Sequence, residues 1–253
     1  MDLQLSGKTA LVTGASAGIG TGIALCLAKE GVRLVITGRN EKALREVASQ
    51  ITAADGTAPV IVAADIATDS GPRKIADAAL QALGGRVDIL INNAGGSRPI
   101  QGEDSDEFWS EAYNLNFVSA RKLTGLIVPA MKAARFGRIM NITGAMTGQK
   151  LNAAGPAKAA LATWSRTLAF ELGPYGITVN TIAPGRINSV QILTRLHPTE
   201  QSRVDYIKQN IPAGYFGEPE DLGNLVAFLA SPLARYISGA AIPVDGGAVR
   251  MAL

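Results

Sequence analysis

The residues best suited to chemistry near the N-terminus form one glycine-rich segment, Thr13-Gly14-Ala15-Ser16-Ala17-Gly18-Ile19-Gly20. A hydrophobic strand-like run precedes it, and an apolar helical pattern follows it. In that context glycines let the backbone bend sharply and let a diphosphate lie against bare N–H groups at a helix start. The spacing differs from G-x-G-x-x-G, so the flanking strand and helix carry the interpretation. We predict a dinucleotide site with contacts from five residues: Gly14, Ser16, Gly18, Ile19 and Gly20.

The ends of the next two strand-like runs carry residues suited to the adenosine half of a dinucleotide. Arg39 and Asn40 stand about where such a fold reads the adenosine ribose. A guanidinium there can pair with a 2′-phosphate, which an acidic residue would repel, so we predict NADP(H) rather than NAD(H). A plain turn with a solvated arginine is the alternative. Asp65 and Ile66 are predicted to contact the adenine, and Asp65 could equally cap its strand.

Two adjacent amides, Asn92 and Asn93, follow the fourth strand-like run. Amides at a strand end can tie neighbouring strands together, and the small pair Ala94 and Gly95 leaves room for a flat ring. We therefore predict that Asn92, Ala94 and Gly95 belong to the cofactor site.

Strand-like and helix-like runs alternate along the whole chain, which indicates helices on both faces of a parallel, doubly wound sheet. We predict a single Rossmann-type α/β domain over residues 1–253, with about seven strands and an irregular substrate lid at about 188–217. The predicted strands are Ala10–Val12, Arg33–Thr37, Pro59–Ala63, Ile89–Ile91, Gly137–Ile142, Thr178–Ile182 and Ala241–Val244.

Composition excludes several classes of protein. The 253 residues are 47% hydrophobic and 18% charged, which suits one domain with a large core. The net charge of +3 comes from scattered Lys and Arg, so we predict no nucleic-acid partner, and we predict no metal site. No apolar run is long enough to cross a bilayer, and the lone Cys26 favours a reducing compartment, so we expect a cytoplasmic protein.

Four motifs in order give the chain a close resemblance to the short-chain dehydrogenase/reductase family. They are Thr13-Gly-x3-Gly-x-Gly, Asn92-Asn-Ala-Gly, Pro184-Gly185 and Val244-Asp-Gly-Gly. The likeness covers essentially the whole chain and is strongest to relatives labelled 3-oxoacyl-[acyl-carrier-protein] reductases. The resemblance implies the predicted fold and an oxidoreductase acting on a carbonyl or hydroxyl substrate.

The family also implies a catalytic tetrad of Asn, Ser, Tyr and Lys, of which this sequence keeps only part. The asparagine matches Asn116, with Asn114 as a competitor, and the lysine that holds the nicotinamide ribose matches Lys158. The tyrosine position holds Ala154, and the serine position holds Gly144. Losing a general acid/base typically costs about 10²–10⁴ in rate, so ordinary hydride chemistry here needs another proton carrier.

Several residues could replace the missing acid. Thr143 and Thr147 carry hydroxyls near the right place, although strand-end or turn hydroxyls are the plainer interpretation. Lys158 could act directly if burial lowered its pKa, or it could only anchor the ribose. Three residues of the predicted lid region are weaker candidates, because we expect packing for the tyrosines and solvation for the histidine: Tyr206, Tyr215 and His197.

The segment after the sixth predicted strand resembles the family's grip on the nicotinamide carboxamide. Its predicted contacts are Pro184, Gly185, Ile187 and Ser189, the last replacing the usual threonine. The helical run after Pro156 carries too little polar surface for an exposed helix, so we predict a homodimer or homotetramer.

Two functions remain open from the sequence. One is an NADP(H)-dependent oxidoreductase with a non-standard proton donor. The other is a catalytically silent family member that binds cofactor or supports an active homologue as a subunit.

Overall fold

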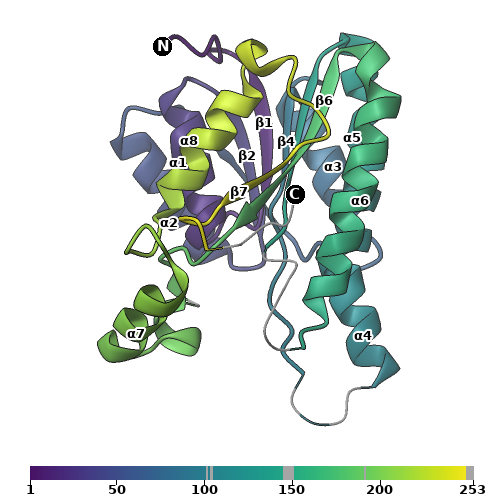
Figure 1. Cartoon of the computed structure of the whole chain (residues 1–253). Helices are drawn as coiled ribbons and strands as arrows, with labels where there is room; N and C mark the ends of the chain where they lie inside the picture. The colour runs from purple at the N-terminus through teal and green to yellow at the C-terminus, as the bar shows by residue number, and fades with distance from the viewer. Residues whose placement is uncertain (101, 103–104, 145–150, 191, 249–253) are drawn as a thin grey trace.

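Seven parallel strands form the centre of the molecule (Figure 1). The structure is a computed structural model of the chain, and it describes residues 1–100, 102, 105–144, 151–190 and 192–248. Within these residues the sheet order is β3-β2-β1-β4-β5-β6-β7. The strands are β1 (Thr9–Thr13), β2 (Arg33–Gly38), β3 (Val60–Ala63), β4 (Ile89–Asn92), β5 (Gly137–Ile142), β6 (Ile177–Pro184) and β7 (Ala241–Val244).

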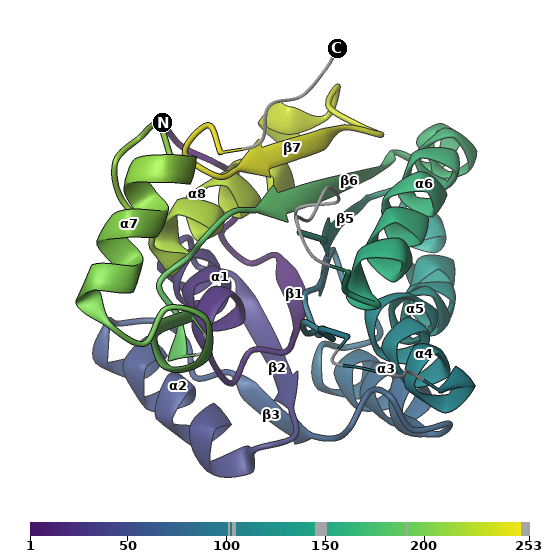
Figure 2. The same ribbon diagram turned by 60° about the horizontal axis from the view of Figure 1, so that its bottom comes forward.

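Helices connect successive strands and cover both faces of the sheet. They are α1 (Gly18–Lys29), α2 (Glu41–Ala53), α3 (Gly71–Ala82), α4 (Asp106–Tyr113), α5 (Ser119–Ala134), α6 (Ala154–Leu172), α7 (Glu200–Asn210) and α8 (Pro219–Ala230). Short helical turns add η1 (Asn114–Val118), η2 (Gly173–Tyr175), η3 (Ile192–Leu196) and η4 (Pro232–Ala234). Figures 1 and 2 show α1, α2 and α8 on one face of the sheet and α3, α5 and α6 on the other.

Each face of the sheet has its own hydrophobic core. Side chains of β1 alternate between the two cores, with Val12 in the α1 and α8 layer and Leu11 in the α3 and α5 layer. All residues of β1 and β5 are buried, because helices cover both sides of these central strands. The predicted doubly wound, single-domain α/β fold is therefore confirmed.

The strand order reverses between β1 and β4, and this reversal positions the site. The chain passes outward from β1 through β2 to β3 and then returns to β4 on the other side of β1. In open α/β sheets, ligands bind in the crevice at the carboxyl ends of the strands where the order reverses. Figure 2 looks onto that end of the sheet.

The region predicted to be irregular, residues 188–217, contains the helix α7, and the expectation of an irregular segment was wrong. Thr199 caps α7 by accepting a hydrogen bond from Ser202 N at 3.2 Å. A small apolar cluster separate from the two main cores holds the region together, and its buried members are Ile192, Ile211 and Phe216. Figure 1 shows α7 set away from the sheet, on the side of α1 and α8.

Candidate functional site

The glycine segment after β1 forms a tight backbone cradle. Gly14 and Gly18 have φ angles of +64° and +57°, in the left-handed region that favours glycine. A Cβ at Gly20 would lie 2.2 Å from Gly14 O, so the start of α1 packs directly on the turn. Ala17, at the N-cap of α1, gives no side-chain hydrogen bond, and the first turn of α1 carries no acidic residue. The first N–H groups of α1 are thus left for a ligand, and a cradle of this kind fits a dinucleotide diphosphate.

Asn93 and Thr13 hold the cradle against the end of β4. Asn93 Nδ2 donates to Thr13 O at 2.9 Å and to Gly14 O at 3.0 Å. Thr13 Oγ1 accepts from the backbone N–H groups of Asn93 and Ala94, both at 3.0 Å. We predicted only that Asn92 and Asn93 tie neighbouring strands together. The hydrogen bonds from Asn93 to the glycine turn are a more specific role.

The predicted adenosine end lies at the tips of β2 and β3. A Cβ at Gly38 would lie 3.1 Å from Ser16 Oγ, so the glycine segment and the end of β2 are in contact. The next residue, Arg39, is exposed and forms no ion pair with any described residue. Asn40 Oδ1 accepts from Ala43 N at 3.1 Å and thereby caps α2.

The third strand ends in a local turn. Asp65 Oδ1 accepts from Ala67 N at 2.9 Å, which matches the alternative capping role of Asp65, and Ile66 is buried. Neither observation tests the predicted adenine contact.

Asn92 turns inward and belongs to a buried polar chain. Its Nδ2 donates to Thr124 Oγ1 at 2.9 Å and to Asn141 Oδ1 at 2.7 Å. Asn141 Nδ2 in turn donates to Ser165 Oγ at 2.7 Å. These bonds tie β4 to α5, β5 and α6, so Asn92 supports the site from within the sheet.

Asn116 lies in the π-helical turn η1, which separates α4 from α5. Its Oδ1 accepts from Gly96 N at 3.0 Å, and its Nδ2 donates to Ala112 O at 2.9 Å. A Cβ at Gly95 would lie 2.9 Å from the same Oδ1, so only glycine allows this approach. The competing Asn114 instead donates to Ala67 O at 2.6 Å, in the connection between β3 and α3. Asn116 therefore lies beside the Gly95-Gly96 backbone, in a π-helical turn of the kind that is frequent at functional sites.

Lys158 on α6 reaches back to the end of β5. Its Nζ donates to Thr143 O, and burial lowers the pKa of Lys158 to about 8. A Cβ at Gly144 would lie 3.6 Å from Lys158 Nζ. Thr143 Oγ1 donates to Ile182 O at 3.1 Å, which is the strand-end role considered for it, so we do not carry Thr143 forward as a proton carrier. The other candidate hydroxyl, Thr147, lies outside the described residues.

A short antiparallel contact joins the loops after β4 and β5. Asn152 Oδ1 accepts from Arg98 N and from Ala154 N, both at 3.0 Å, and its Nδ2 donates to Ser97 Oγ at 2.7 Å. Ala153 N donates to Arg98 O at 2.9 Å. Sequence reasoning missed Asn152 and Arg98, because no local pattern marks a pairing of residues 54 positions apart.

The segment after β6 packs on two turns of its own chain, at Asp245 and at Gly18. A Cβ at Gly185 would lie 2.6 Å from Asp245 Cα, which explains a glycine beside the Asp245-Gly246-Gly247 turn. A Cβ at Gly18 would lie 3.1 Å from Ser189 Cβ, so the segment starting at Pro184 crosses to the glycine cradle. Ile187 is buried and pairs with Gly217 in an isolated bridge.

His197 is packed between aromatic rings, and the expectation of a solvated histidine was wrong. Its ring centroid lies 4.5 Å from that of Tyr206 and 5.4 Å from that of Phe216. The Arg186 guanidinium stacks over Tyr206 at 4.9 Å. Burial first, then the charge of Arg186, lowers the pKa of His197. Tyr215 is 62% exposed and lines a cavity of about 430 Å³ with Arg186.

The described residues contain neither a candidate membrane span nor a candidate metal cluster. No described helix is both long and apolar enough to span a membrane. The same part of the chain contains no group of three His, Cys, Asp or Glu residues placed to hold a metal ion.

Comparison with known proteins assigns the family. A family model described as enoyl-(acyl carrier protein) reductase matches residues 14–249. The 3-oxoacyl-[acyl-carrier-protein] reductase FabG of Escherichia coli (strain K12) is 38% identical over 251 residues, covering 97% of this chain and 98% of the relative. This chain belongs to the short-chain dehydrogenase/reductase family, as its motifs predicted.

Two solved structures extend the likeness to the fold. L-sorbose reductase from Gluconobacter frateurii, complexed with NADPH and L-sorbose, has a TM-score of 0.93 at 32% identity over 100% of both chains. A 7 alpha-hydroxysteroid dehydrogenase complexed with NADH and 7-oxo glycochenodeoxycholic acid has a TM-score of 0.90 at 34% identity, covering 99% of this chain and 97% of that one. The fold with its seven-stranded parallel sheet is thus that of the family.

Proposed function

We propose that this protein is an NADP(H)-dependent oxidoreductase that interconverts a carbonyl and an alcohol by a non-standard proton-transfer arrangement. The observation that carries the proposal is that two features lie at the carboxyl ends of β1 and β5, the two strands that flank β4 in the sheet. The uncapped glycine cradle follows β1, and Lys158 is held at the end of β5 by Thr143 O. The first suits a dinucleotide, and the second places an amine near the region where the reactive end of that dinucleotide would lie.

The choice of NADP(H) depends on Arg39. Its guanidinium is exposed beside the Ser16 and Gly38 contact and can pair with a 2′-phosphate. Three solved relatives hold NADPH or NADP, which supports this choice, and one holds NADH. An arginine in place of an acidic residue at this strand end supports the phosphorylated cofactor.

Different residues of the chain would bind different parts of the dinucleotide. The cradle from Gly14 to Gly20 binds the diphosphate, Ser189 lies beside the cradle where it can reach the carboxamide, and Lys158 holds the nicotinamide ribose. Asn116 fixes the Gly96 backbone that borders the ring site. When bound, the cofactor supplies or accepts the hydride.

The substrate class is a small molecule with a ketone or secondary alcohol. The relatives' names include an acyl-carrier-protein reductase, a sugar reductase and a steroid dehydrogenase, which share only this functional group. The resemblance is strongest to 3-oxoacyl reductases, and 3-oxoacyl thioesters are therefore the first substrates to test.

The test is NADPH oxidation by the purified protein across a panel of ketones, 3-oxoacyl thioesters included, with the reverse reaction on the matching alcohols. The proposal expects turnover of at least one pair. Tight NADPH binding without turnover, with activity gained by combining Gly144→Ser and Ala154→Tyr, would contradict it.

A silent family member is the second candidate, and it is favoured by the identity of Gly144 and Ala154 at the family's serine and tyrosine positions. In that role the chain would bind NADP(H) and support an active homologue in a hetero-oligomer. Recovery of activity only when a homologous subunit is added would support this second function.

The proposal also covers the oligomeric state of the protein and its location in the cell. Phe170 on α6 is 87% exposed, so its own described chain leaves this aromatic uncovered. We propose a homodimer or homotetramer that covers α6, in a cytoplasmic setting suited to the lone Cys26. Burial raises the pKa of the Cys26 thiol, which keeps it unreactive.

A further inference from the structure

We infer that the Lys158 ammonium itself donates the proton to the substrate carbonyl oxygen, in place of the phenol that other family members use. The inference rests on the reductase activity proposed above and names the acid that this activity requires. It assigns Lys158 a second task besides holding the ribose.

The position of the ammonium group supports direct transfer. Among the described residues, Lys158 Nζ donates one hydrogen bond, to Thr143 O at the carboxyl end of β5. An ammonium has three N–H donors, so two remain for other acceptors. Among the described residues no carboxylate forms an ion pair with Lys158. The charge is therefore held in place without being neutralised.

The two positions whose side chains could cover Lys158, Gly144 and Ala154, carry only a hydrogen and a methyl group. A Cβ at Gly144 would lie 3.6 Å from Lys158 Nζ and 3.7 Å from its Cδ, so any longer side chain there would reach the ammonium. Ala154 precedes Lys158 by four residues on α6 and therefore lies on the same side of the helix. Neither position carries a hydroxyl group, so neither Gly144 nor Ala154 supplies another proton donor beside Lys158 Nζ.

The acidity of Lys158 suits this task. Burial lowers its pKa to about 8, close to the range where a general acid works best at neutral pH. The Thr143 hydroxyl donates to Ile182 O, and His197 packs against Tyr206 in the 188–217 region. Tyr215, in the same region, is 62% exposed, whereas Lys158 Nζ is held at the end of β5.

The proton and the electrons balance in the proposed step. The carbonyl carbon gains a C–H bond from the hydride that NADPH supplies, and the π electrons of the C=O bond move to oxygen. The oxygen then takes a proton from Lys158, which becomes a neutral amine. Solvent returns a proton to the amine, and the net products are the alcohol and NADP⁺.

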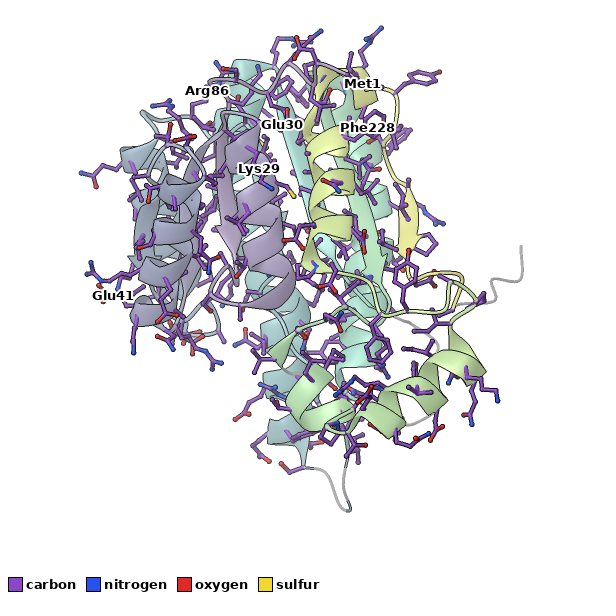
Figure 3. All side chains as sticks on the ribbon, turned by 90° about the vertical axis from the view of Figure 1, so that its left-hand side faces the viewer. Met1, Lys29, Glu30, Glu41, Arg86 and Phe228 are labelled. Carbon is purple, nitrogen blue, oxygen red and sulfur yellow. The ribbon has the colours of Figure 1, made fainter. Side chains whose placement is uncertain are left out.

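The test combines single-turnover kinetics at saturating NADPH with the substitution Lys158→Arg. Arginine keeps the positive charge, but its guanidinium is not deprotonated in proteins and so cannot donate a proton. We expect the variant to bind NADPH and to reduce the best ketone about 10²–10⁴-fold more slowly, which is the typical contribution of a general acid. Lys29→Arg is the matched control, because Lys29 ends α1 opposite the cradle and Figure 3 shows it far from α7.

Two measurements on the unaltered protein keep the test decisive if Lys158→Arg does not fold. The reduction rate should fall as pH rises above about 8, because the amine loses the proton that it must donate. Competitive acetylation of the NADP⁺-bound protein, read by mass spectrometry against pH, should give Lys158 a pKa below that of an ordinary lysine side chain.

Each outcome separates the two proposals. Reduction that survives Lys158→Arg within threefold, or a Lys158 pKa at the ordinary lysine value, overturns the inference and leaves the proposed reductase standing. NADPH binding with no reduction of any carbonyl overturns the reductase and the inference with it.

Discussion

Asn116 joins the loop after β4 to helix α4 beside the proposed nicotinamide site. Its amide bridges Gly96 N and Ala112 O, so it sets the position of the backbone after β4 relative to the helix that follows. The oxygen of the amide accepts one of these bonds, and its nitrogen donates the other. Its role is thus to position the loop that faces the reacting ring.

Replacing Asn116 by alanine should reduce turnover more than replacing Asn114. Asn116→Ala leaves the Gly96 N–H without its acceptor, which costs about 1–3 kcal/mol where such a group is shielded from water. We expect at least a tenfold loss of turnover with NADPH. Asn114→Ala removes a bond to Ala67 O and should lower the urea midpoint while changing turnover by less than threefold. Equal losses in the two variants would contradict the assignment of Asn116.

At this scale the sequence predicted the residues that face the crevice better than those that support it. Gly14 and Gly20 belong to the glycine motif after β1, and Lys158 belongs to a motif on α6 that reaches the end of β5. Asn152 and Arg98 had no such signal, because their role arises only when two distant loops meet. His197 was misjudged because its burial depends on aromatic partners from α7 and the segment before α8.

The glycine turn and α1 act as one element. The 2.2 Å approach of a Cβ at Gly20 to Gly14 O shows that helix and turn are packed without room for a methyl group. The contact is backbone to backbone, so a larger residue must move the turn itself. The geometry of the cradle depends on this packing.

Gly20→Ala should therefore abolish NADPH binding and lower stability. We expect at least a hundredfold weaker binding by fluorescence titration, because the turn that holds the diphosphate must shift. Gly125→Ala is the matched control: Gly125 lies within α5 with nothing within 4 Å of its Cβ position, so helix propensity alone should raise stability by about 0.5–1 kcal/mol. Normal NADPH binding by Gly20→Ala would contradict the proposed cradle.

The region containing α7 should loosen as pH falls. Burial and the charges of Arg186 and Arg203 lower the pKa of His197, and a hydrogen bond with the Ser202 backbone opposes them. A lowered folded-state pKa means that the neutral form contributes stability above about pH 6.5, and that this stability is lost as pH falls through the lowered pKa.

Hydrogen exchange of residues 192–216, corrected for the intrinsic effect of pH, measures this loss. We expect faster exchange at pH 5 than at pH 7 in the unaltered protein. His197→Phe keeps an aromatic ring beside Tyr206 and Phe216 but does not titrate, so it should remove the difference. A difference that persists in His197→Phe would show that another group is responsible.

The sequence predicted the overall fold, because buried strand-like runs alternate with helix-like runs along the chain. Runs such as Leu11-Val12 and Ile89-Leu90-Ile91 are buried on both faces and alternate with helices, so a parallel sheet was the expected arrangement. The helix α7 could not be predicted in the same way. None of the residues of α7 is buried, so the helix has no clear apolar face. Its position depends instead on the small apolar cluster of Ile192, Ile211 and Phe216.

Association should depend on the outer face of α6. Phe170→Glu places a charge where an exposed aromatic side chain stands, so we expect a shift toward smaller species in sedimentation velocity. Val204→Glu on α7, where Val204 is 50% exposed, is the matched control and should leave the oligomer unchanged. A protein that sediments as a monomer before any substitution would contradict the proposed assembly.

The central claim is that the crevice between β1 and β4 binds NADP(H), and paired titrations with NADPH and NADH test it most directly. We predict that NADPH binds at least tenfold more tightly than NADH, and that Arg39→Asp reverses this order by repelling the 2′-phosphate while accepting a ribose hydroxyl. Failure to bind either cofactor, or equal binding of both that Arg39→Asp leaves unchanged, would contradict the account.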